Sequence, residues 1–131
     1  MKAHKFLEEK GLEFEVVEQD NPTKSCDDAA RERGVDTSQI VKSLIVERHE
    51  EKGLKEGELV HVLLPGDREI SEKKFGESHL IPPEKSEKIT GFESGTVHPF
   101  STEIKHVIDY RVLENNKVSF TVGEQLRGVI I

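Results

Sequence analysis

Short runs of apolar residues alternate with charged ones along the chain, and none of them is long. Residues 12–17, LEFEVV, alternate apolar and acidic side chains, which is the pattern of a half-buried strand. Residues 40–47, IVKSLIVE, and residues 59–64, LVHVLL, are mostly apolar and predict two buried strands. The polar stretch 49–58 between them holds two glycines and predicts a hairpin connection.

The helices that the sequence predicts are short. Ser25 followed by Asp28 is a capping signal for a helix that runs to Arg33 and stops at Gly34. Comparable patterns predict the remaining elements, which are helices over 3–10, 71–75 and 83–88, strands over 106–109, 117–122 and 128–131, and a loop over 89–103. This order indicates an α+β fold with a mixed, curved sheet in one domain over residues 1–131.

Composition and charge narrow the function classes. The net charge of −7 at pH 7 argues against non-specific nucleic-acid binding, which depends on neutralising phosphates, but leaves room for a local basic groove. No stretch approaches the roughly 20 apolar residues that span a bilayer, and the charged start does not resemble a secretory signal. The single cysteine fits a reducing compartment. We therefore expect a soluble, cytoplasmic protein without membrane contact.

Familiar catalytic signatures are absent from the sequence, and its six histidines lack the close spacing of metal ligands on one element. We expect neither a metal nor a cofactor. Cys26 stands where the helix that follows Ser25 begins, and a helix N-terminus can lower a thiol pKa enough to make a nucleophile. The alternative is that Cys26 only fills a helix start.

Three further features are candidates for chemistry. Lys42 stands within the first buried strand, where an amine is costly unless it snorkels to water or faces a functional site. The loop TGFESGTVHPF, residues 90–100, can turn backbone N–H groups toward an oxyanion, or it is a surface loop pinned by Pro99 and Phe100. Asp109, at the end of VID, is either a pocket carboxylate or a turn former.

Three segments, in their order along the chain, resemble the YbaK/ProX family of free-standing aminoacyl-tRNA editing deacylases, relatives of the prolyl-tRNA synthetase editing domain. They are AARERGVDTSQIVKSLIV, VHVLLPGDREISEKKFG and TGFESGTVHPF. The third segment is similar to the family's Gly-x-x-x-Pro loop, as Gly95 to Pro99, and VIDYRVLENNKVSFTVGEQLRGVII resembles the closing strands. The resemblance covers nearly the whole chain.

This resemblance implies a mixed, barrel-like β-sheet flanked by short helices. It also implies hydrolysis of a mischarged aminoacyl-tRNA of the Cys- or Ala-tRNA(Pro) type, without a metal or a covalent enzyme nucleophile. By position, Lys42 resembles the family lysine that contacts the terminal nucleotide or phosphate, and Gly95 resembles the glycine whose backbone N–H holds the scissile carbonyl. The residues expected to bind substrate around them are Ser43, Ser94, Thr96, Val97, His98, Pro99, Phe100 and Asp109. The implied partners are an aminoacylated tRNA 3′ end and an aminoacyl-tRNA synthetase.

Departures from the family pattern leave the amino acid open. Ser43 stands where threonine is frequent, and Thr96 and His98 replace small residues often found in the loop. Together with the acidic charge, these changes leave room for a non-catalytic module that binds a tRNA end, a nucleotide or a synthetase. Affinity for tRNA that is independent of aminoacylation, without turnover, would favour this alternative.

Overall fold

The computed structural model describes residues 3–21, 25–49, 57–70, 75, 77–92, 97–121 and 127–131. Its helices are α1 (Ala3–Glu9), α2 (Cys26–Arg33) and α4 (Pro83–Thr90), with 3-10 turns η1 (Thr37–Gln39) and η2 (Tyr110–Glu114). Its strands are β1 (Glu15–Glu18), β2 (Val41–His49), β3 (Glu58–Pro65), β4 (Glu77–Leu80), β5 (His106–Ile108), β6 (Ser119–Thr121) and β7 (Arg127–Ile130). The predicted α+β class is confirmed. No helix in these described ranges is long and apolar enough to cross a membrane.

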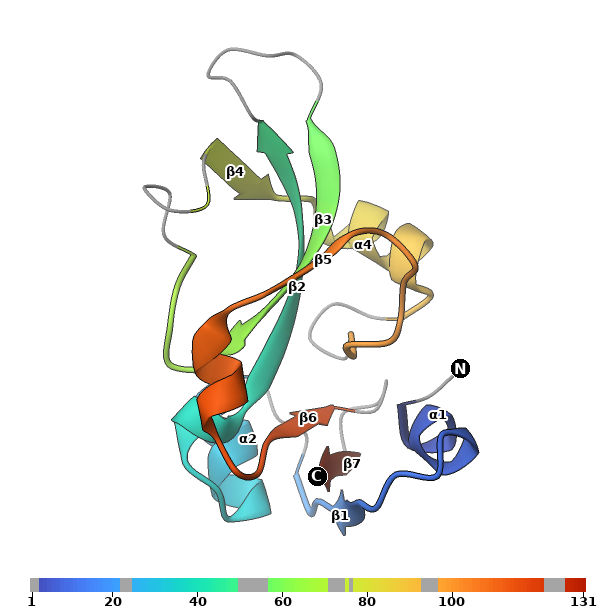
Figure 1. Ribbon diagram of the computed structural model, residues 1–131, viewed down its shortest axis with the longest axis vertical. Helices are drawn as coiled ribbons and strands as arrows, with labels where there is room; N and C mark the ends of the chain where they lie inside the picture. The colour runs from blue at the N-terminus through green and yellow to red at the C-terminus, as the bar shows by residue number, and fades with distance from the viewer. Residues whose placement is uncertain are drawn as a thin grey trace.

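The strands form two sheets. The larger has the order β4-β2-β3-β5 and is mixed, because β3 and β5 run parallel while the other pairs are antiparallel. The smaller has the order β1-β7-β6 and is antiparallel throughout. An isolated parallel bridge joins Ile40, just before β2, to Ser119 of β6. Figure 1 shows the smaller sheet at one end of the long β2–β3 pair, with α2 beside it.

The β2–β3 pair is apolar on both faces, which explains why the sequence of these strands is almost continuously hydrophobic. Their side chains alternate between two buried clusters, since successive residues of a strand point to opposite faces. One cluster contains Val41 and Leu63 together with Leu7, Val112 and Phe120. The other consists of Val46, Val60, Val62 and Leu64. The predicted strands 40–47 and 59–64 are confirmed, and their antiparallel pairing fits the predicted hairpin, whose residues 50–56 lie outside the described ranges.

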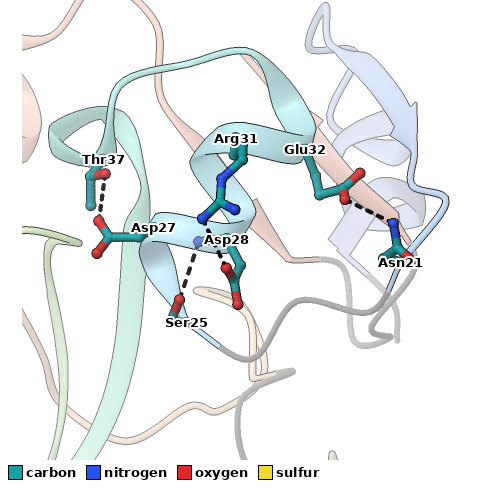
Figure 2. A network of polar contacts seen from close by, with 7 residues as sticks. All are labelled: Asn21, Ser25, Asp27, Asp28, Arg31, Glu32 and Thr37. Carbon is teal, nitrogen blue, oxygen red and sulfur yellow. Dashed lines mark hydrogen bonds and ion pairs between the residues drawn. The ribbon is translucent and has the colours of Figure 1, made fainter.

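Helix α2 begins and ends where the sequence predicts. The Ser25 hydroxyl accepts a hydrogen bond from the Asp28 N–H at 3.1 Å, and Gly34 closes the helix with a φ of 69°, a conformation that favours glycine. Side-chain bonds hold its outer face, and Figure 2 shows them as Arg31 to Asp28 at 3.1 Å, Thr37 to Asp27 at 2.9 Å and Asn21 to Glu32 at 3.3 Å. The opposite face of the helix is buried and consists of Ala29, Ala30 and Arg33.

Several parts of the described chain differ from the sequence-based predictions. The predicted strand 12–17 is β1, which begins only at Glu15, and α4 covers Ile89 and Thr90 of the predicted loop 89–103. β4 was not predicted, because its side chains are mostly exposed and main-chain pairing with β2, from Val46–Leu80 to His49–Glu77, defines it. The predicted strand 106–109 ends one residue early, since Asp109 instead caps η2 by accepting a hydrogen bond from the Arg111 N–H. The predicted helix 71–75 falls mostly on residues 71–74, which lie outside the described ranges.

Candidate functional site

A cavity of about 740 Å³ opens between α2, β2 and the junction of β4 with α4. Lys42 and Ser43 of β2 line it, together with Cys26 and Arg33 of α2 and Val97, which lies between α4 and β5. Its volume is in the range of pockets that hold a small molecule or the end of a larger one. Three of the predicted site residues therefore line one cavity: Lys42 and Ser43 from β2, and Val97 from the loop.

Lys42 meets a partner at this cavity. Its Nζ lies 3.4 Å from the Glu69 Oε1, and the lysine side chain is 17% exposed while that of Glu69 is 90% exposed. An ion pair whose partner is so exposed contributes at most about 1 kcal/mol. The stem of Lys42 is thus mostly buried while its ammonium reaches an exposed carboxylate. Because it is not locked in a buried ion pair, the ammonium is available to a stronger anionic partner.

Ser43 and Val97 are the other predicted site residues that line this cavity. The Ser43 Oγ is buried and has no hydrogen-bond partner among the described residues. Val97 is buried, and its carbonyl oxygen accepts a hydrogen bond from the Thr121 Oγ1 at 3.4 Å. Both residues were expected at the substrate, and both lie at the cavity.

The loop that was expected to hold the scissile carbonyl is described only from Val97 onward, and Ser94, Gly95 and Thr96 lie outside the described residues. His98 is fully buried, and its Nδ1 accepts a hydrogen bond from the Phe100 N–H at 3.1 Å.

The loop is fixed further along by Pro99 and Phe100. The Pro99 carbonyl oxygen lies 2.9 Å from the His106 Nε2. Phe100 stacks on Phe6 of α1 with ring centroids 4.3 Å apart, and it is not among the cavity residues. In this geometry His98, Pro99 and Phe100 anchor the end of the loop and do not line the cavity.

Asp109 lies elsewhere. It lines a second cavity of about 700 Å³, bounded by β3, β5 and η2, together with Arg111. The Arg111 guanidinium donates hydrogen bonds to both carboxylate oxygens, and this bonding lowers the pKa of Asp109 to about 2. Asp109 thus caps η2 and lines the cavity that Glu69, the partner of Lys42, also lines.

Cys26 also lines the first cavity, but its chemistry differs from that of an activated thiol. Burial raises the pKa of the Cys26 thiol above its ordinary value, and the nearby Lys42 ammonium only partly opposes this. The thiol is therefore protonated at neutral pH, and protonated thiols are poor nucleophiles. The interpretation of Cys26 as a residue that fills the helix start is favoured.

Arg33 is the cavity residue that sequence reasoning missed. It is 5% exposed on the inner face of α2, its Nε donates to the Gln19 Oε1 at 2.9 Å, and its Nη1 donates to the Ser119 Oγ at 3.2 Å. Burial lowers the pKa of the guanidinium to about 10, which still leaves it charged at neutral pH. One signal was present in the sequence: Arg33 follows Ala29 by four positions and so shares its helix face.

No group of three histidine, cysteine, aspartate or glutamate side chains in the described ranges is placed to hold a metal ion. The polar side chains that line the first cavity are two cations, a neutral thiol and four hydroxyls, which belong to Ser25, Ser43, Ser86 and Thr121. Such a set binds anions and orients substrates, and it is not a set of divalent-metal ligands.

Comparison with known proteins agrees with this chemistry. Residues 20–131 match the model of the aminoacyl-tRNA editing domain. The hypothetical protein APE2540, whose crystal structure is solved, is similar to this chain at 25% identity with a TM-score of 0.80, over 100% of this chain and 88% of that one. A candidate trans-editing enzyme for prolyl tRNA synthetase is similar at 25% identity with a TM-score of 0.76, over 95% of this chain and 80% of that one. No curated protein matches the chain.

Proposed function

The chain belongs to the family of aminoacyl-tRNA editing domains, and from this premise we propose that it hydrolyses the ester bond of a mischarged aminoacyl-tRNA. The family and the similar trans-editing protein support a tRNA deacylase function in general terms. The observation that carries the finer proposal is the position of Lys42 at a cavity of about 740 Å³, where its one ion-pair partner among the described residues is an exposed carboxylate.

Lys42 positions the tRNA terminus in this proposal. The Glu69 carboxylate oxygen, 3.4 Å from the lysine ammonium, marks a place where an anionic oxygen of the substrate can sit. A phosphate that is held by the cavity can displace a carboxylate that is 90% exposed, because the displaced group is solvated without strain. The lysine then fixes the terminal nucleotide and with it the ester.

The backbone N–H of Gly95 holds the scissile carbonyl in this proposal, two residues before the cavity residue Val97. An aminoacyl ester is already activated, so orientation and stabilisation of the oxyanion supply most of the acceleration. Attack by water on the carbonyl carbon breaks its bond to the ribose oxygen; the ribose leaves as a free hydroxyl that takes up a proton from the water, and the amino acid is released with a free carboxylate. The protonated Cys26 thiol leaves the attack to an oxygen nucleophile.

The proposed substrates are tRNA(Pro) species charged with cysteine or alanine, and a synthetase is the further partner proposed. The support is the similar protein described as a candidate trans-editing enzyme for prolyl tRNA synthetase. The remaining substrate contacts are proposed for Ser43 and Val97 in the cavity, and for Ser94 and Thr96 beside Gly95.

The test is hydrolysis of tRNAs charged with Cys, Ala, Ser and Pro by wild type and by Lys42→Ala. We expect selective release of one amino acid by wild type and a loss of about 100-fold in the variant, since a hydrogen bond to a charged group contributes enough for that. Glu69→Ala is the matched control, because it removes the partner of Lys42 and leaves the ammonium in place. Unchanged release by Lys42→Ala would refute the role of the lysine, and tRNA binding without any release would favour a binding module.

A further inference from the structure

Two buried polar atoms in the first cavity have no hydrogen-bond partner among the described residues. They are the Arg33 Nη2 and the Ser43 Oγ, from α2 and β2 respectively. Buried donors in native proteins are almost always paired, because an unpaired one retains its full desolvation cost. Two such atoms in the same cavity indicate that their partner is a group that enters it.

The rest of the Arg33 side chain is held in place by three elements. Gln19, just after β1, accepts from its Nε, and Ser119 of β6 accepts from its Nη1. Gly128 of β7 lies so close that a Cβ there would overlap the guanidinium. The side chain is thus fixed on a neutral cradle while its Nη2 lacks a hydrogen-bond partner among the described residues, which is the form of a pre-organised site.

The charge of Arg33 is not balanced within the described part of the chain. Its two acceptors are an amide and a hydroxyl, and no carboxylate in those ranges forms an ion pair with it. Burying a cation without an anion is costly, and native proteins retain such groups where a ligand supplies the opposite charge. A guanidinium presents its donors in a plane that suits the oxygens of a carboxylate or a phosphate.

We propose that Arg33, with Ser43 beside it in the cavity, is an oxyanion-binding site that takes a carboxylate or a phosphate. Arg33 and Lys42 share no bonding partner: Arg33 of α2 donates to Gln19 and Ser119, whereas Lys42 of β2 pairs with Glu69. The proposed site is therefore separate from the Lys42–Glu69 pair. Its role in substrate choice rests on the proposed deacylase function: the oxyanion is then either a phosphate of the tRNA end or an acidic side chain of the esterified amino acid. Binding itself does not depend on turnover.

The first experiment titrates the full chain with inorganic phosphate and follows the Nε–H resonance of Arg33 by nuclear magnetic resonance. We expect a saturable shift of this resonance. In Arg33→Met, which lacks this resonance, the apparent Kd for phosphate is measured by titration calorimetry beside wild type and should rise about tenfold or more, as for loss of a charge-assisted hydrogen bond. The matched control is Arg31→Met, which removes the same charge from the same helix at an exposed position paired with Asp28.

The outcomes separate the possibilities. A binding loss in Arg33→Met but not in Arg31→Met supports the site, whereas equal binding by both variants, or no shift of the wild-type resonance, overturns it. The wild-type titration decides the matter even if Arg33→Met does not fold.

A second experiment identifies the source of the oxyanion. Binding of AMP compared with adenosine tests a phosphate, and binding of glutarate compared with glutaramide tests a carboxylate. An Arg33-dependent preference within one pair identifies the source, and no preference in either pair overturns the proposal. Phosphate binding in a protein that releases no amino acid would refute the deacylase function and retain the site.

Discussion

The two cavities of this protein are nearly equal in volume, about 740 and 700 Å³, but they differ in how their charges are balanced. In the second, Arg111 is neutralised by Asp109 through hydrogen bonds to both carboxylate oxygens. In the first, Lys42 has only the exposed Glu69, which itself lines the second cavity, and Arg33 has no carboxylate in the described part of the chain.

This difference is more informative than volume. In the second cavity the Asp109–Arg111 ion pair is closed on itself, and it serves the local turn. In the first cavity the two cations are not neutralised by a buried carboxylate of the described residues, and the Ser43 hydroxyl has no hydrogen-bond partner among them. Such a cavity can bind an anionic substrate. The predictions below test whether activity follows the first cavity and stability the second.

The largest effect is expected from Gly95→Val, next to the first cavity in sequence. A side chain there would displace the backbone N–H proposed to hold the carbonyl, and losing one oxyanion donor lowers kcat about 100- to 1000-fold. Single-turnover deacylation measures this change. Asp109→Asn, in the second cavity, is the control and should leave kcat unaltered. An equal loss in both variants would remove the functional distinction between the cavities.

The second prediction concerns the stability of the fold at low pH. It depends on His61 of β3, the strand that pairs with β2 and lines the second cavity. Burial lowers the pKa of His61 on β3 to about 4, and the nearby His106 and His98 act in the same direction. The unfolded chain therefore takes up this proton near pH 6.5 and the folded chain only near pH 4. Stability is full above pH 6.5 and falls by about 2–3 kcal/mol as the pH decreases to 4.

Chemical denaturation at several pH values measures this loss, and His61→Leu should remove most of it between pH 6.5 and 4. Because β2 and β3 are paired throughout, both cavities should lose their structure together. Loss of anion binding well above the pH of the stability change would show instead that the first cavity opens independently.

The smallest effect is expected from Asp109→Ala in the second cavity. The change removes the cap of η2 and should lower the free energy of unfolding by about 1 kcal/mol, with deacylation unaffected. Thermal denaturation and the tRNA panel measure the two quantities. A fall in activity beyond the fall in folded fraction would return Asp109 to the site.

Local signals were enough to predict the parts of the fold that depend on neighbouring residues. The cap at Ser25 and the stop at Gly34 bound α2 correctly, and the apolar runs located β2 and β3. β4 lacked such a signal because its pairing with β2 is a main-chain interaction and its side chains are mostly exposed. The parallel pairing of β5 with β3 was also beyond the sequence, since strands of three residues carry little periodicity.

The site was predictable to a similar degree. Lys42 was noticed because a charge stood in an apolar run, and Ser43 and Val97 followed from the family resemblance. Arg33 was not noticed, because arginine is usual in the last turn of a helix, where it complements the helix dipole. What distinguishes it is contact with Gln19 and Ser119, which only the folded chain brings together.

The pairing of β1 with β7 has a consequence for the order of folding. The β2–β3 hairpin joins neighbouring segments and closes at small entropic cost, whereas β1–β7 joins segments from opposite ends of the chain and must close slowly. Gln19 and Gly128, which flank Arg33, come from the segments that close late. We therefore expect a newly made chain to present Lys42 on its hairpin before the arginine is held, so that the site at Arg33 forms only when the last strands have joined.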